Sequence, residues 1–137
     1  MSGQIGFNPV PAVVTASGKL AVGLASGGNV TQTGARTNAV TLDTLTGVVY
    51  AYGTSLAAGA VTTFTVNNSE VVGLQDVIVL SSTNSTPGTS IAYVSEVGVG
   101  YFDVTVRNLS TTTADTGVFG SNWPILSFMV LRGAANP

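Results

Sequence analysis

The chain has 137 residues, a formal net charge of −2 and a charged-residue content of only 7%. Average soluble domains contain roughly 25% charged residues. A content this low is typical of a rigid, β-rich structural protein or of a subunit whose surface is extensively covered by partners. Four cations against six carboxylates form no basic patch, which argues against nucleic-acid binding through phosphate neutralisation.

The sequence contains neither cysteine nor histidine. Disulfides and thiolate metal sites are therefore excluded, and the commonest general base is missing. No apolar run approaches the roughly 20 residues of a membrane helix. The first residues lack the basic start and apolar core of a signal peptide, so we expect a soluble product made inside the cell.

Residues 1–26 are predicted to form an N-terminal arm with a first hairpin. Glycine and proline recur in residues 1–12, and prolines favour extended backbone. Short apolar segments at residues 13–15 and 20–24 flank a turn, as in a hairpin. Two interpretations of the arm stay open: a frayed terminus, or a segment that lies on a neighbouring protein. In the second, the contacting side chains would be Ile5, Phe7 and Val10.

Residues 27–137 are predicted to form the main domain, which opens with several short strands. A threonine-rich strand over residues 61–67 places Phe64 and Val66 inward, because alternate side chains share one face. Residues 55–59 are too few for a stable helix, so we expect one helical turn or a tight loop. The other expected elements are a strand near residues 40–42, a turn at 44–47, and a strand with Val48, Tyr50 and Tyr52 on one face.

The clearest strand pattern is YFDVTVRN at residues 101–108. Strict alternation of apolar and polar side chains is what a half-buried strand requires. We therefore expect a central strand with Phe102, Val104 and Val106 in the core. Its opposite face would carry Tyr101, Asp103, Thr105 and Arg107.

Residues 76–80 and 123–132 are apolar on both faces, a pattern that predicts interior strands. A further strand is expected at residues 91–97, joined by a glycine turn to the central strand. Seven to nine short strands with turns between them, and no amphipathic helix, predict an all-β fold. We expect an antiparallel, jelly-roll-like β-sandwich.

Catalytic chemistry has few candidates in this sequence. Asp103 and Glu96 lie on adjacent predicted strands and are the best candidates for a hydrolytic carboxylate pair. The alternatives are two solvent-facing charges, or a pairing of Asp103 with Arg107. A calcium site from Asp76, Asp103 or Asp115 lacks the acidic spacing of a calcium loop. We therefore predict no catalytic, cofactor-binding or metal-binding residues.

Tyr50 and Tyr52 are the remaining candidates for a binding role. Two tyrosines at positions i and i+2 of one strand form a platform on which a carbohydrate could stack. Tyrosine also favours core and half-wet interface positions, because its ring is apolar and its hydroxyl is polar. The two residues are thus predicted to be interface or ligand aromatics.

A series of short motifs, together with their order and spacing, resembles a recurring β-domain of tailed-bacteriophage virion proteins. That domain occurs in capsid decoration or cement proteins, head fibres and tail-associated proteins. The resemblance covers about residues 27–133. The motifs are GGNVTQT (27–33), VTL (40–42) with Gly47 after it, LAAGA (56–60), TFTV (63–66), NS (68–69), DVIV (76–79), FDVTVRN (102–108) and FMVLRG (128–133).

The resemblance implies a non-enzymatic virion subunit, typically a homotrimer, on the outer surface of the capsid. Its partners would be the major capsid protein and further copies of itself, with no nucleic acid, membrane, cofactor or small-molecule substrate. It would be made in the bacterial cytoplasm and function in the virion. The alternative is a phage tail or head-fibre module that binds host surface carbohydrate. The short arm before a single domain favours a decoration protein over a long fibre.

Overall fold

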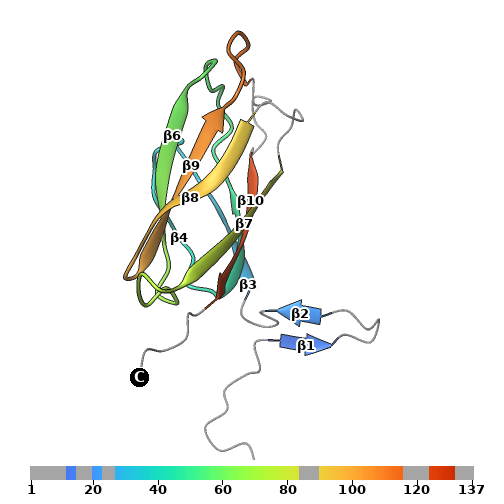
Figure 1. Ribbon diagram of the computed structural model, residues 1–137, viewed down its shortest axis with the longest axis vertical. Helices are drawn as coiled ribbons and strands as arrows, with labels where there is room; N and C mark the ends of the chain where they lie inside the picture. The colour runs from blue at the N-terminus through green and yellow to red at the C-terminus, as the bar shows by residue number, and fades with distance from the viewer. Residues whose placement is uncertain (1–11, 15–19, 23–26, 84–89, 116–123, 132–137) are drawn as a thin grey trace, which may run out of the picture.

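The computed structural model describes residues 12–14, 20–22, 27–83, 90–115 and 124–131, in which regular structure consists entirely of strands (Figure 1). Two four-stranded sheets form the two layers of a sandwich, which confirms the predicted all-β class. The β10 sheet has the order β3 (Gly27–Thr31), β5 (Thr46–Tyr50), β10 (Ile125–Leu131), β7 (Val77–Thr83). The β9 sheet has the order β4 (Val40–Thr41), β6 (Val61–Asn67), β9 (Tyr101–Asn108), β8 (Ser90–Gly98).

The predicted first hairpin is also present. Strands β1 (Ala12–Val14) and β2 (Leu20–Val22) pair antiparallel as a separate two-stranded sheet. Residues 1–11, which include Ile5, Phe7 and Val10, lie outside the described residues. The extended arm and the division between residues 1–26 and 27–137 therefore stay predictions.

The sheets are antiparallel except at one edge of each. Strand β3 runs parallel to β5, and β4 runs parallel to β6. Parallel neighbours cannot be joined by a hairpin and need a crossover. Here the crossover passes through the opposite sheet, because β4 separates β3 from β5 and β5 separates β4 from β6. The predicted antiparallel arrangement thus holds for the other four pairings of the two sheets, β5–β10, β10–β7, β6–β9 and β9–β8.

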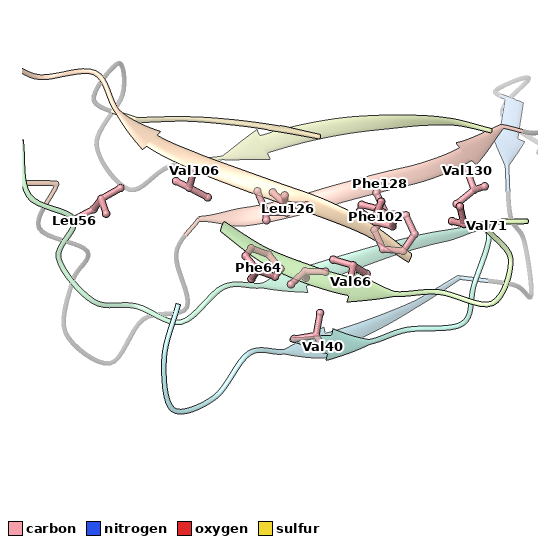
Figure 2. Close-up of a cluster of buried hydrophobic side chains, with 12 residues drawn as sticks. Val40, Leu56, Phe64, Val66, Val71, Phe102, Val106, Leu126, Phe128 and Val130 are labelled. Carbon is pink, nitrogen blue, oxygen red and sulfur yellow. The ribbon is translucent and has the colours of Figure 1, made fainter. Parts of the chain in front are cut away.

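The core lies between the two sheets, whose inward side chains meet there (Figure 2). Phe102, Val104 and Val106 of β9 are buried as predicted, and so are Phe64 and Val66 of β6. At the centre, the rings of Phe102 and Phe128 make an edge-to-face contact with centroids 5.2 Å apart. Such contacts add about 0.5–1.5 kcal/mol beyond area burial. They also join the two sheets at their interior strands.

The predicted turn at residues 44–47 is correct only for its first half, because the chain bends at residues 44 and 45 but is already a strand at Gly47. Residues 44–47 were expected to form a turn, but β5 already begins at Thr46 and Gly47 is buried within it. A Cβ at Gly47 would lie 2.5 Å from Leu42 Cδ2 and 2.8 Å from Phe128 Cε1. The glycine therefore leaves room for core side chains to lie close to the strand, where any larger residue would clash with them. By contrast, Gly100 has φ +82° and occupies the expected turn between β8 and β9.

The second correction concerns the residues predicted to form an interior strand at 76–80. The chain does form β7 here, but β7 is the edge strand of the β10 sheet. Its inward residues Ile78 and Leu80 pack against the core, whereas its outward residues Val77 and Val79 are exposed. Within the segment at 123–132, residues 125–131 form the interior strand β10, as predicted.

Candidate interaction surfaces

The outer face of the β9 sheet carries a row of hydrogen-bonded hydroxyl groups. The Oγ1 atoms of Thr63 and Thr105 are 2.8 Å apart, and Thr105 Oγ1 donates to Ser95 Oγ at 2.8 Å. This row crosses β6, β9 and β8. Next to it, Thr65 Oγ1 donates to Asp103 Oδ1 at 2.7 Å. These contacts tie three strands together through side chains as well as through backbone.

Thr105 differs from the prediction in one respect. Its side chain lies on the outer face, as the alternation predicted, yet only 4% of the residue is exposed. The registered neighbours Thr63 and Tyr93 flank it on the two adjacent strands. At the middle of this sheet, a side chain on the outer face can therefore be shielded from water by its neighbours.

Glu96 and Asp103, the candidate carboxylate pair, face each other in register on β8 and β9. Each carboxylate accepts a hydrogen bond from a different side chain. Tyr101 OH donates to Glu96 Oε1 at 2.7 Å, and Thr65 Oγ1 donates to Asp103 Oδ1. The hydrogen bond to the Glu96 carboxylate raises the pKa of the Tyr101 phenol, and the negative charges of Glu96 and Asp103 act in the same direction. The two carboxylates thus belong to the hydrogen-bonded pattern of an open sheet face.

The outer face of the β10 sheet has a different character. None of its four strands contains Asp, Glu, Lys or Arg. Its outward positions are occupied by valine, isoleucine, leucine, methionine, tyrosine, serine, threonine, asparagine and glycine. These positions are Gly27, Asn29 and Thr31 on β3, Thr46, Val48 and Tyr50 on β5, Ile125, Ser127, Met129 and Leu131 on β10, and Val77, Val79, Ser81 and Thr83 on β7.

The most apolar part of this face lies where β7 meets β10, and we call it the β7–β10 patch: Val77, Val79, Met129 and Leu131. Val77 pairs with Leu131, and Val79 pairs with Met129, so the four side chains form two adjacent rows. Val77, Val79 and Leu131 are 54%, 45% and 44% exposed. A sheet face normally exposes polar side chains to water. Because its exposed apolar side chains are adjacent rather than scattered, this patch is the candidate interaction surface of the β10 sheet.

The two predicted aromatic residues lie close in sequence but in different settings. Tyr50 ends β5 and belongs to the outer face of the β10 sheet, between Thr31 and Ile125. Tyr52 lies beyond the strand, and its backbone N–H donates to Gln32 Oε1 at 2.9 Å. Both side chains are partly exposed. Their role as interface or ligand aromatics stays a prediction.

One buried polar cluster was not anticipated from the sequence. Arg36 is 8% exposed, and its guanidinium group donates hydrogen bonds to the Oγ1 atom and to the backbone carbonyl oxygen of Thr54. Burial lowers the pKa of Arg36, and the negative charge of Asp115 partly opposes this. Asp115 is also buried and accepts a hydrogen bond from Ser90 Oγ at 2.5 Å. The cluster links loops that are distant in sequence, which is a structural role.

The three aspartates considered for calcium occupy separate places. Asp76 accepts from the backbone N–H of Val72, Asp103 accepts from Thr65, and Asp115 accepts from Ser90. Within the described ranges, no three Asp, Glu, His or Cys side chains are grouped so that they could hold a metal ion. The same part of the chain contains no helix long and apolar enough to cross a membrane.

Comparisons of the chain with protein-family models, with curated proteins and with solved structures find no match.

Proposed function

We propose that this protein is a non-enzymatic structural subunit of a tailed-bacteriophage virion, which decorates and stabilises the outer capsid surface as a homotrimer. The observation that supports the proposal most strongly is the outer face of the β10 sheet, which has no charged residue and exposes apolar side chains. A face of this kind is easier to bury against protein than to solvate. The motif resemblance to phage virion β-domains supplies the setting in which the burial occurs.

The mechanism of stabilisation is clamping of neighbouring capsid proteins. A subunit that binds only the assembled shell shifts the assembly equilibrium by mass action, by about 2.7 kcal/mol for each site at a free concentration of 100 times Kd. In this proposal the N-terminal arm contacts the major capsid protein through Ile5, Phe7 and Val10. The rigid sandwich spans the distance between neighbouring attachment sites.

A second candidate is a tail or head-fibre module that binds host carbohydrate. It is favoured by the outer face of the β9 sheet, where the side chain of Tyr93 is 44% exposed. An exposed tyrosine presents an apolar ring for stacking and a hydroxyl group for hydrogen bonding. The other aromatic residues proposed for this role are Tyr50 and Tyr52.

Purified virions of the phage that encodes this chain distinguish the two candidates. Quantitative mass spectrometry gives the copy number, and immunogold labelling gives the location on the particle. Hundreds of copies over the head are expected for a decoration protein. A few copies at one vertex would indicate the tail module, and absence from the particle would overturn both.

A further inference from the structure

We infer that copies of this chain contact one another through the β7–β10 patch. The number of copies in the oligomer, three, is taken from the proposed function, whereas the contact itself is argued from the structure. The patch is formed by two registered pairs, Val77 with Leu131 and Val79 with Met129. No charge interrupts it on any strand of the sheet. The inference follows from three features of the structure: the two sheet edges, the pattern of β7, and the distribution of charge.

The first feature is a contrast between two edge strands. Exposed sheet edges are usually protected from pairing with other chains by charges, prolines or bulges. Strand β8 has two of these devices, because it carries Glu96 and shows a register shift between Val94 and Glu96. Strand β7 is also an edge, yet it pairs with β10 without a register shift and contains neither charge nor proline. Of these two described edges, β8 thus carries protective devices and β7 carries none.

The second feature is the pattern of β7 itself. Residues 77–80 are apolar on both faces, which is typical of a strand covered on both sides. Among the residues that the structure describes, only the inward side of β7, with Ile78 and Leu80, packs against the core. The outward side, with Val77 and Val79, has the composition of a covered face, yet no described part of the chain covers it. We therefore place its cover outside the protomer.

The third feature identifies the occupant as a second copy. A partner with a charged surface would find no opposite charge on this face, and its own charges would lose hydration without compensation. An identical copy presents an equally neutral, apolar patch, so association buries apolar surface with no like-charge repulsion. The charged side chains of the sheets, Glu96, Asp103 and Arg107, all lie on the β9 sheet and stay away from this contact.

A matched pair of substitutions tests the inference. Val79→Lys introduces a charge into the patch, and Ile91→Lys introduces the same charge at an equally exposed position on the protected edge strand β8. Sedimentation velocity of the full chain gives the dissociation constant of the oligomer. We expect Val79→Lys to raise this constant at least tenfold and Ile91→Lys to change it less than twofold. Equal association of wild type and Val79→Lys, or equal weakening by both variants, would overturn the inference.

Cysteine cross-linking tests the same contact with a smaller change. The chain has no native cysteine, so Val79→Cys and Ile91→Cys each create a single reactive site. Under mild oxidation we expect Val79→Cys to form covalent dimers at a protein concentration at which Ile91→Cys stays uncross-linked. The reverse result, or a monomeric wild type, would overturn the inference. Neither experiment uses virions, so a failed contact is distinguishable from absence of the protein from the particle.

Discussion

Thr105 shows how much a single hydroxyl group contributes to the stability of the β9 sheet. Alternation assigns it to the outer face, but its neighbours bury it and it bonds to both Thr63 and Ser95. A net contribution of about 0.5–1.5 kcal/mol is typical of one such hydrogen bond. We expect Thr105→Val to lower the free energy of unfolding by about 1 kcal/mol or somewhat more. Thr41→Val, at an exposed position of β4, should change it by about 0.5 kcal/mol or less. Chemical denaturation at one protein concentration measures both, and equal effects would contradict the role of the hydroxyl row.

Tyr101 gives a prediction about pH. Its hydrogen bond to Glu96 favours the protonated phenol, so the folded-state pKa lies above the ordinary value of 10.0. Stability from this contact is therefore present below that ordinary pKa and is lost as pH rises through the higher folded-state pKa. We expect Glu96→Gln to lower the pKa of Tyr101, because the amide cannot supply the negative charge. Ultraviolet titration of the tyrosines, compared between wild type and Glu96→Gln, measures this. Identical titration curves would show that the contact does not form in solution.

At the scale of the element, β9 is the central strand through which one sheet of the sandwich contacts the other. Phe102 is fully buried and contacts Phe128 of the opposite sheet. Phe102→Ala should lower the free energy of unfolding by about 3–5 kcal/mol, because transfer energy is lost and a cavity remains. Val61→Ala, on the exposed face of the neighbouring β6, should have an effect of about 0.5 kcal/mol or less. Thermal unfolding at matched concentrations compares them. An equally small effect of both would mean that the core lies elsewhere.

Elements with strict alternation could be predicted from the sequence. Strands β6 and β9 each have one core face and one outer face, so their in-out assignment follows from period 2 alone. Strand β7 could not be placed, because apolar residues on both faces indicate cover but do not say whether the cover comes from the same chain. Gly47 was placed in a turn because the sequence does not show which side chains approach a glycine.

The interaction surfaces were harder to predict than the strands. Sheet order decides which outward residues become neighbours, and the pairing of β7 with the C-terminal strand β10 is a long-range contact. The β7–β10 patch therefore exists only in the folded chain. The buried cluster of Arg36, Thr54 and Asp115 was missed for the same reason, because three separate loops contribute to it.

At the scale of the whole molecule, the structure shows which sheet lacks charged residues. Sequence composition predicted a covered surface without saying where it lies. In the structure, the β9 sheet carries Glu96, Asp103 and Arg107, whereas no strand of the β10 sheet contains a charged residue. A subunit with this asymmetry is suited to an assembly in which one sheet meets other copies and the other sheet stays hydrated.

The proposed homotrimer is tested most directly by sedimentation velocity of the wild-type chain at micromolar concentration. The expected result is one species of about 41 kDa, three times the 13.8 kDa mass of the chain, because three neutral patches are buried together. The species should persist at high salt, since burial of apolar surface is not screened by ions. A single 13.8 kDa species over the whole micromolar range would contradict the proposal that the β10 sheet is covered by further copies of this protein.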